Sequence, residues 1–176
     1  MQWTQEKLLA FLNTQGIDIQ QRQHPAVFTM AESAGLNLNL PGTRCKNLLV
    51  RNKKNSHRYL IVTPPDAAVD LGALGKLLAS GRLSLCSPAD MLDLLGVAPG
   101  AMSPLSLIAD QEAQQIQLIM DADLAASRHF QFHPLVNTAT IAISQEDFRK
   151  FLAAVNQSFR YLPIPRRIMT DTPVSC

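Results

Sequence analysis

The sequence lacks any apolar run long enough to cross a membrane as a helix. No apolar stretch approaches the ~20 residues that such a helix needs, and residues 1–6 carry no basic segment followed by an apolar one. A secretory signal is therefore not expected. The chain has three cysteines, Cys45, Cys86 and Cys176. Because their number is odd and their spacing is unlike that of metal ligands, we expect no disulfide framework and a reducing, cytoplasmic setting.

The sequence also lacks the signatures of common catalytic and cofactor sites. It has no Gly-x-Ser-x-Gly nucleophile elbow and no motif that marks a catalytic cysteine. Its glycines form neither a Gly-x-Gly-x-x-Gly pattern nor a P-loop, which argues against a nucleotide cofactor. His129 and His133 are four residues apart, but Pro134 and the alternating Phe-Gln-Phe-His sequence predict extended chain. Four extended residues span ~13 Å, too far for one metal ion to bridge, so we expect neither metal nor cofactor.

The sequence also lacks a large net charge of either sign. The 176 residues carry a formal net charge of +2, with 17% charged and 47% hydrophobic residues. These values are typical of an ordinary globular chain with one core, and +2 is too small to indicate nucleic-acid binding by itself. We therefore expect one domain at residues 1–162, followed by a flexible, proline-containing tail at residues 163–176.

What the sequence does have is a series of helix and strand signals in irregular order. Capping residues precede five predicted helices, at Thr4, Thr29, Asp70, Ser87 and Ser144. Seven segments have the apolar character or alternation of short strands, at residues 17–23, 46–51, 58–63, 83–85, 105–109, 116–121 and 138–144. Because helices and strands do not alternate as βαβ units, the sequence predicts an α+β fold with a mixed sheet of about seven strands.

Basic residues gather in one region that contains no acidic residue. Fifteen residues, 44–58, contain Arg44, Lys46, Arg51, Lys53, Lys54, His57 and Arg58. One interpretation is a solvated face at the tip of a hairpin, and the alternative is an edge that binds an RNA backbone. Lys46 differs from the others because it begins the apolar run Leu48-Leu49-Val50, at the expected edge of the core.

A second region of interest is the corner that precedes the strand at residues 138–144. It carries His133, Pro134 and Asn137, and a histidine and an amide at the mouth of a strand suit the floor of a small pocket. By default, however, a lone histidine is a core or corner residue that has found a hydrogen bond. Gly100 and Pro104, four residues apart, are weak evidence by themselves because such spacings are common in turns.

Three segments taken together resemble one family more specifically than any of them does alone. They are Lys46-Asn47 at the start of an apolar strand, Gly-Ala-Met-Ser-Pro at residues 100–104, and Phe-His-Pro-Leu-Val-Asn-Thr-Ala-Thr at residues 132–140. Their order and spacing resemble those of the free-standing prolyl-tRNA editing proteins, which deacylate Ala-tRNA(Pro). That family is related to the editing insertion domain of bacterial prolyl-tRNA synthetases and to the Cys-tRNA(Pro) deacylases. The resemblance covers roughly residues 4–162.

The resemblance implies a strongly curved mixed sheet flanked by helices, with a small pocket for the aminoacyl group on the 3′ end of tRNA. Lys46 resembles the family's essential lysine, which is expected to contact the phosphate near the terminal adenosine, with Asn47 beside the substrate. The other basic residues of the region would follow the tRNA backbone, namely Arg44, Arg51, Lys53, Lys54 and Arg58. Cys45 departs from the threonine or other small residue expected before the lysine.

The resemblance also assigns roles to the loop and the corner. The loop is formed by Gly100, Ala101, Met102, Ser103 and Pro104, and it would cradle the ester with its backbone N–H groups facing the carbonyl. His133 resembles the pocket histidine that limits substrate size, and Asn137 a polar partner near it. A pocket rejects a larger side chain by steric overlap far better than it rejects a smaller one by weaker packing, since a methylene is worth only ~1–3 kcal/mol.

These roles suit the chemistry of the reaction. An aminoacyl ester is already activated, so its hydrolysis needs a placed water and a stabilised oxyanion more than a strong nucleophile. The ribose 2′-hydroxyl, an ordered water or His133 would handle the proton. We therefore expect a trans-editing hydrolase that cleaves mischarged tRNA(Pro), most simply Ala-tRNA(Pro), and spares Pro-tRNA(Pro).

Two alternatives stay open at this point. One is a deacylase for another misacylated tRNA, such as Cys- or Ser-tRNA, because pocket volume depends on packing. The other is an RNA-binding module of the same fold without turnover. A prolyl-tRNA synthetase or an elongation factor is the candidate protein partner, and no membrane partner is expected.

Overall fold

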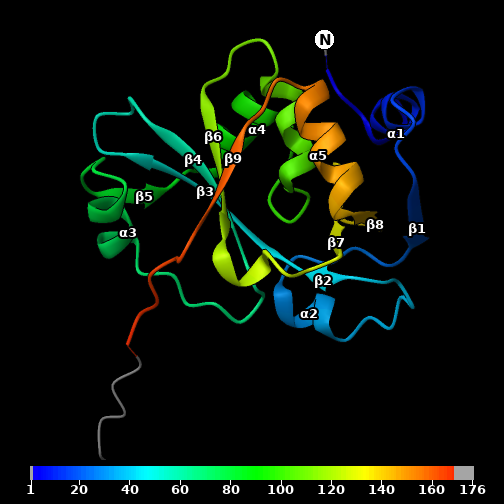
Figure 1. Ribbon diagram of the computed structural model, residues 1–176, viewed down its shortest axis with the longest axis horizontal. Helices are drawn as coiled ribbons and strands as arrows, with labels where there is room; N and C mark the ends of the chain where they lie inside the picture. Colours follow the sequence, from blue (N-terminus) through cyan, green and yellow to red (C-terminus); the bar gives the residue numbers. More distant parts are fainter. Residues whose placement is uncertain (1, 169–176) are drawn as a thin grey trace, which may run out of the picture.

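The computed structural model describes residues 2–168 and contains five helices, two 3-10 segments and nine strands within that range (Figure 1). The elements of the amino-terminal half are α1 (Gln5–Thr14), β1 (Ile19–Gln23), α2 (Met30–Ala34), β2 (Thr43–Arg44), β3 (Lys46–Asn52), β4 (Arg58–Thr63), α3 (Leu71–Leu77), β5 (Leu83–Leu85) and α4 (Pro88–Leu95). The remaining elements are η1 (Pro104–Asp110), β6 (Ile116–Asp121), η2 (Ala122–Leu124), β7 (His129–Phe132), β8 (Ala139–Ser144), α5 (Gln145–Ala154) and β9 (Phe159–Leu162).

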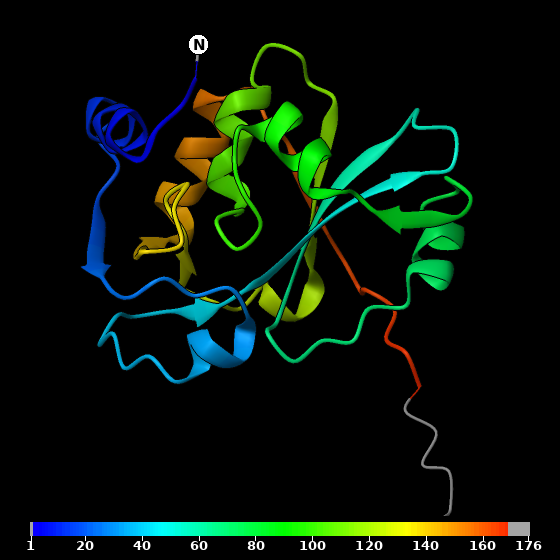
Figure 2. The same cartoon turned by 180° about the vertical axis from the view of Figure 1, so that it is seen from behind.

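The strands form two mixed sheets, which confirms the predicted α+β class. One sheet has four strands in the order β1-β8-β7-β2, and the other has five in the order β5-β3-β4-β6-β9. Each contains both parallel and antiparallel pairs. Cys45 is the single residue between β2 and β3, so the chain passes from one sheet into the other at this point. In Figure 2, β3 crosses the molecule from the hairpin at one side to β2 and α2 at the other.

The five-stranded sheet separates two hydrophobic clusters. Alternate residues of β3 contribute to opposite faces, because successive side chains of a strand point in opposite directions. Leu49 belongs to the larger cluster, which also includes residues of α1, α4, α5, β7 and β8. Val50 belongs to the smaller cluster, which α3 and Ile164 help to build. By the same alternation, the side chains of Lys46 and Asn47 at the start of β3 lie on opposite faces of the sheet.

All five predicted capping residues begin helices. The side chains of Thr4, Thr29, Asp70, Ser87 and Ser144 each accept a hydrogen bond from a backbone N–H of the following first turn. Thr29 and Ser87 form complete capping boxes, with Glu32 and Asp90 as the reciprocal partners. Because one residue and its first turn determine a cap, these helix starts could be predicted without knowledge of the tertiary fold.

One predicted strand is wrong. Residues 105–109 belong to the 3-10 segment η1 and not to a strand. Ser103 caps this segment by accepting the Leu105 N–H at 3.2 Å, and Pro104 occupies its first turn. The apolar run that suggested a strand reflects burial instead, since Leu105, Leu107 and Ile108 are all fully buried. The short strands β2 and β9 were not predicted.

The chain beyond β9 is held against the body of the protein as far as Arg167. Ile164 is buried, Asp70 donates its N–H to the Pro165 carbonyl at 2.9 Å, and Arg167 donates its N–H to the Ala68 carbonyl at 2.8 Å. These contacts involve residues that the sequence analysis assigned to the tail. Residues 169–176 of the expected tail lie outside the described residues. Within residues 2–168, no helix combines the length and apolarity that a membrane crossing requires.

Candidate active site

A pocket of about 220 Å³ brings together some of the predicted site residues. Four parts of the chain surround it. They are α2 together with the segment before it, the β2–β3 connection, the 100–104 loop and the end of β7. The lining residues are Val27, Phe28, Thr29, Met30, Ser33, Leu38, Arg44, Cys45, Lys46, Asn47, Met91, Pro99, Gly100, Met102, Gln131, Phe132, His133 and Thr140. Segments that are as much as about a hundred residues apart in sequence therefore meet at one site.

Lys46 and Asn47 both line the pocket, although their side chains lie on opposite faces of β3. The Asn47 side chain donates from Nδ2 to the Met102 carbonyl at 3.2 Å, which ties β3 to the 100–104 loop. Its Oδ1 is buried and has no hydrogen-bond donor among the described residues. Lys46 borders the pocket, but its ammonium donates to the carbonyl of Ala67, which is not part of the lining. Desolvation, followed by the nearby charge of Arg166, lowers the pKa of Lys46.

The 100–104 loop contributes only part of its length to the pocket. Gly100 and Met102 line it, whereas Ala101, Ser103 and Pro104 are buried behind it. Gly100 has a φ of +87°, a conformation that favours glycine, and an added Cβ would lie 3.2 Å from the Val27 carbonyl oxygen. Asn137, expected near the substrate, instead donates from Nδ2 to that same carbonyl at 3.0 Å. Asn137 thus holds the segment before α2 and does not line the pocket.

His133 lies directly after β7 and faces the pocket. Phe130 and Phe132 anchor β7 in the core, where the Phe132 ring lies 5.2 Å from that of Phe148. His133 Nδ1 is 2.8 Å from the carbonyl oxygen of Ala139, the first residue of β8. A carbonyl can only accept, so Nδ1 carries the proton and Nε2 of the neutral ring is left as an acceptor. Burial is the main cause that lowers the pKa of His133, and the neighbouring His24 adds to it.

The corner between His133 and Ala139 has a constrained backbone. Leu135 adopts a φ of +66°, which is an outlier for a bulky residue. The corner is held from outside by His24, which donates its N–H to the Thr138 carbonyl at 2.9 Å, and by Val27, which donates its N–H to the Asn137 carbonyl at 3.1 Å. These hydrogen bonds connect the corner to the segment that leads into α2. The position of His133 therefore depends on a segment that is distant in the sequence.

His24 is a site neighbour that the sequence did not reveal. Its ring centroid lies 5.9 Å from that of His133, and its Nε2 is 2.9 Å from Thr140 Oγ1 in the pocket wall. Its Nδ1 is 2.8 Å from the Pro25 carbonyl oxygen. No local signal could have placed His24, because the antiparallel pairing of β1 with β8 brings it there.

Cys45 lines the pocket but is unsuited to act as a nucleophile. The residue is buried, and burial raises the pKa of its thiol to about 12. The reactive form of cysteine is the thiolate, which is negligible at neutral pH for such a group. Cys45 is therefore a poor candidate for a covalent nucleophile.

The basic residues do not form one surface. Arg44 alone of the predicted backbone-binding set lines the pocket, and its Nη2 donates to Ser33 Oγ at 2.6 Å. The others lie along or beyond the far end of β3, whose six steps from Lys46 to Asn52 span about 20 Å. Arg51 and Lys53 border a second hollow there. Arg82, which the sequence analysis did not single out, completes that basic rim.

A metal-dependent mechanism has no donor set to support it in the described part of the chain. Within residues 2–168, no three His, Cys, Asp or Glu side chains gather in a way that could hold a metal ion. His129 belongs to β7 and pairs with Ser144, whereas His133 follows the strand and turns toward the pocket.

Comparison with known proteins finds a matching family model and several relatives. A model of the aminoacyl-tRNA editing domain matches residues 24–151. Prolyl-tRNA synthetase associated domain-containing protein 1 of Mus musculus is 35% identical over 136 residues, which make up 75% of this chain and 79% of that protein. The prolyl-tRNA editing protein ProX of Acetoanaerobium sticklandii is 27% identical over 159 residues, or 90% of this chain and 96% of that protein.

Comparison with solved structures finds similar folds. A solved structure described as a candidate trans-editing enzyme for prolyl-tRNA synthetase has a TM-score of 0.65 at 20% identity, covering 92% of this chain and 98% of that one. These findings confirm the resemblance first drawn from the segments at Lys46, Gly100 and His133. This chain belongs to the aminoacyl-tRNA editing domain family, and it is a deacylase that acts on mischarged tRNA.

Proposed function

We propose that this deacylase hydrolyses Ala-tRNA(Pro) and spares Pro-tRNA(Pro). The observation that carries the proposal is the pocket of about 220 Å³ bordered by Lys46, Asn47, Gly100, Met102 and His133. Pockets for drug-sized ligands have volumes of roughly 300–1,000 Å³. The smaller volume here suits the aminoacyl end of the tRNA, with the rest of the terminal nucleotide outside.

Two backbone N–H groups of the 100–104 loop are suited to hold the ester carbonyl. The Ala101 N–H donates to the Ala98 carbonyl at 3.1 Å, the Ser103 N–H donates to Ser106 Oγ at 3.3 Å, and Pro104 has no N–H. Gly100 and Met102 line the pocket, and neither N–H has an acceptor among residues 2–168. Preorganised donors of this kind stabilise the oxyanion of acyl transfer. The oxyanion site proposed from the whole loop thus narrows to these two groups.

Asn47 is suited to bind the amino group of the substrate. Its Oδ1 is a buried acceptor without a donor among the described residues, and leaving such a group unpaired is costly. The α-amino group of an aminoacyl ester is a donor that would satisfy it. Asn47 would then orient the amino acid while its Nδ2 keeps the loop in place through the Met102 carbonyl.

The ribose 2′-hydroxyl of the substrate is our candidate for handling the proton. No serine or cysteine dyad is present in the pocket lining, and Cys45 stays protonated. Replacing the terminal adenosine by its 2′-deoxy form should abolish turnover while tRNA binding persists. Undiminished turnover would instead make His133 the base, with a pH–rate limb displaced below ~6.5 because its pKa is lowered.

Selectivity would come from the size of the pocket rather than from its polarity. The three lining hydroxyls, Thr29, Ser33 and Thr140, are all hydrogen-bonded inside the protein. Thr29 and Ser33 act only as acceptors in these hydrogen bonds and keep their O–H donors, so polarity alone does not separate the methyl of alanine from the hydroxyl of serine. His133 would exclude the ring of proline by steric overlap, which discriminates more strongly than a small difference in packing.

The tRNA acceptor end would reach the pocket past Lys46 and Arg44. Lys46 would contact the phosphate near the terminal adenosine, and Arg51, Lys53, Lys54, Arg58 and Arg82 would meet the backbone further along. Replacing any one phosphate-binding side chain by alanine should lower the salt dependence of tRNA binding by about one ion. A prolyl-tRNA synthetase or an elongation factor as a protein partner stays a prediction.

The second candidate function is removal of cysteine or serine, because about 220 Å³ exceeds what a methyl group fills. Deacylation rates measured side by side on tRNA(Pro) charged with alanine, cysteine or serine would decide between them. We expect alanine to be released fastest. Faster release of cysteine or serine would replace the proposed substrate and leave the deacylase activity unaffected.

A further inference from the structure

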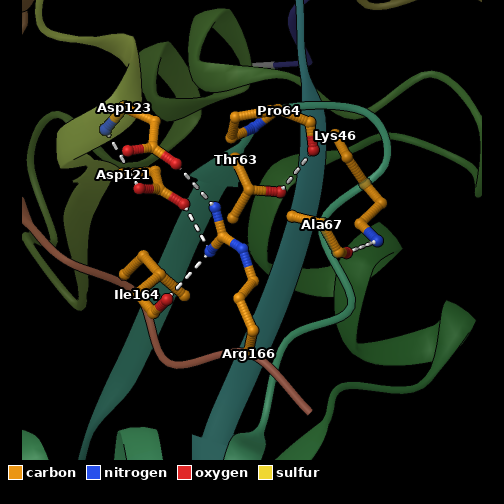
Figure 3. Close-up of polar contacts among 8 residues, drawn as sticks. All are labelled: Lys46, Thr63, Pro64, Ala67, Asp121, Asp123, Ile164 and Arg166. Carbon is orange, nitrogen blue, oxygen red and sulfur yellow. Dashed lines mark hydrogen bonds and ion pairs between the residues drawn. The ribbon is translucent and has the colours of Figure 1, made fainter. Parts of the chain in front are cut away.

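Arg166 lies outside the pocket lining and after the last strand, yet its guanidinium has the most elaborate set of partners in this part of the protein. Nη1 lies 2.6 Å from Asp121 Oδ2, and Nη2 lies 3.1 Å from Asp123 Oδ2. Nη1 also donates to the carbonyl of Ile164 at 2.8 Å. Figure 3 shows the guanidinium between these three oxygens. The function described so far makes no use of this cluster.

The ion pair with Asp121 attaches the C-terminal segment to the end of β6. The residue ends β6 and is 1% exposed. Its Oδ1 accepts the Asp123 N–H at 3.1 Å, whereas its Oδ2 is buried and has no hydrogen-bond partner among the described residues, so the ion pair with Arg166 is what compensates its charge. Removing the cation from a buried carboxylate is strongly destabilising. Arg166 therefore fixes residues 163–167 against the end of β6.

The anchored segment in turn pairs with the loop between β4 and α3. Val69 and Arg166 form an antiparallel bridge. On either side of it, Asp70 donates its N–H to the Pro165 carbonyl at 2.9 Å and Arg167 donates its N–H to the Ala68 carbonyl at 2.8 Å. Residues 68–70 are thus held by backbone hydrogen bonds to a segment that Arg166 keeps in place.

This loop receives the ammonium of Lys46. Nζ donates to the carbonyl of Ala67, immediately before the paired residues, as Figure 3 shows. The other end of the loop is closed by Pro64, whose carbonyl accepts from Thr63 Oγ1 at 3.0 Å and from the Ala67 N–H at 3.2 Å. The position of the Lys46 ammonium therefore depends on the loop, and that of the loop depends on the C-terminal segment.

We propose that Arg166 is a positioning residue for deacylation. By anchoring residues 163–167 to Asp121 and Asp123, it fixes the 64–70 loop, whose Ala67 carbonyl holds the Lys46 ammonium ready for the tRNA phosphate. Arg166 is committed to two carboxylates and lies outside the pocket lining. This inference rests on the role of Lys46 in the proposed function.

A double-mutant cycle tests the dependence of Arg166 on Lys46. Arg166→Ala should lower kcat/KM for Ala-tRNA(Pro) at least ~10-fold, whereas Lys46→Ala/Arg166→Ala should stay within ~2-fold of Lys46→Ala alone. Losses that multiply in the double variant would overturn the proposal. Arg160→Ala is the matched control, since this exposed arginine of β9 forms no ion pair among the described residues. If Arg166→Ala melts below the assay temperature, Arg166→Lys, which keeps the charge, replaces it in the cycle. The loss of kcat/KM that Arg166→Lys causes should then likewise disappear in the Lys46→Ala background, and losses that multiply would overturn the proposal.

Backbone hydrogen exchange provides a readout that does not require activity. In Arg166→Ala the amides of Asp70 and Arg167 should exchange at least ~10-fold faster, while Arg160→Ala should leave them unchanged and Arg166→Lys should restore part of the protection. Unchanged exchange at these amides would overturn the proposal whatever the activity. A wild-type protein that fails to hydrolyse the charged tRNAs would instead overturn the proposed function and leave this structural arm intact.

Discussion

Ser103 Oγ donates a 2.7 Å hydrogen bond to the carbonyl oxygen of His133. This single hydrogen bond joins the loop proposed to hold the ester carbonyl to the corner that carries the pocket histidine, across thirty residues of sequence. Ser103 is fully buried and also caps η1 by accepting the Leu105 N–H. One hydroxyl group, that of Ser103, therefore holds the 100–104 loop against the corner that carries His133.

Ser103→Ala should reduce both stability and activity. It leaves a buried carbonyl without its donor, which costs about 1–3 kcal/mol, and it removes a helix cap. Urea unfolding measures the stability loss, and the deacylation rate under folded conditions measures the displacement of Gly100 and Met102. Ser87→Ala is the matched control, because it removes the cap of α4, worth about 1 kcal/mol, at a serine outside the pocket lining. Equal activity of the two variants would show that Ser103 is merely a cap.

The lowered pKa of His133 predicts that stability falls with acidification. Its folded-state pKa lies below the ordinary value of 6.5, so the unfolded chain binds more protons between the two values. Stability linked to His133 is thus fully present above pH ~6.5 and is lost as the pH falls through the folded-state pKa. Unfolding free energies measured down to about pH 5 should decline in the wild type and decline less in His133→Asn, which does not titrate. Parallel curves would contradict the prediction.

His133→Ala should widen the substrate range. Removing the ring enlarges the pocket, so Pro-tRNA(Pro) should become a substrate while Ala-tRNA(Pro) is still hydrolysed. The ratio of the two kcat/KM values reports the change, since discrimination by size is a difference in transition-state binding. Unchanged discrimination would remove His133 from the specificity role, and loss of both activities would assign it to catalysis.

Cys45 should resist alkylation in the folded protein. Because burial raises the pKa of its thiol to about 12, iodoacetamide at pH 7–8 should leave it unmodified while the enzyme stays active. Peptide mass spectrometry after a timed exposure follows Cys45 itself, and protein unfolded in urea provides the positive control. Rapid modification of Cys45 together with inactivation would reopen a role for the thiol.

The locally coded parts of the fold were predictable. The five caps and the hairpin of β3 and β4 each depend on residues close in sequence. The segment at residues 105–109 was not predictable as 3-10 helix, because a buried apolar run has the same pattern in a strand and in a helix. The strands β2 and β9 were missed because each is short and pairs in parallel with a strand distant in sequence.

The candidate site was likewise predictable only in part. Lys46, the 100–104 loop and His133 could be chosen by resemblance, and the structure brings all three to one pocket. The direction of the Lys46 ammonium toward Ala67 could not be foreseen, since it depends on a loop twenty-one residues away. Nor could the neighbours His24 and Arg166 be foreseen, since the first reaches the region through strand pairing and the second through an ion pair with the buried Asp121.

The most direct test compares the hydrolysis of Ala-tRNA(Pro) and Pro-tRNA(Pro) by the wild-type protein under single-turnover conditions. A pocket built to admit a methyl and to exclude a ring predicts rapid release of alanine, at least ~100-fold faster than release of proline, as expected for steric exclusion rather than for weaker packing of one methylene. Equal rates for the two substrates, or faster release of proline, would contradict the account.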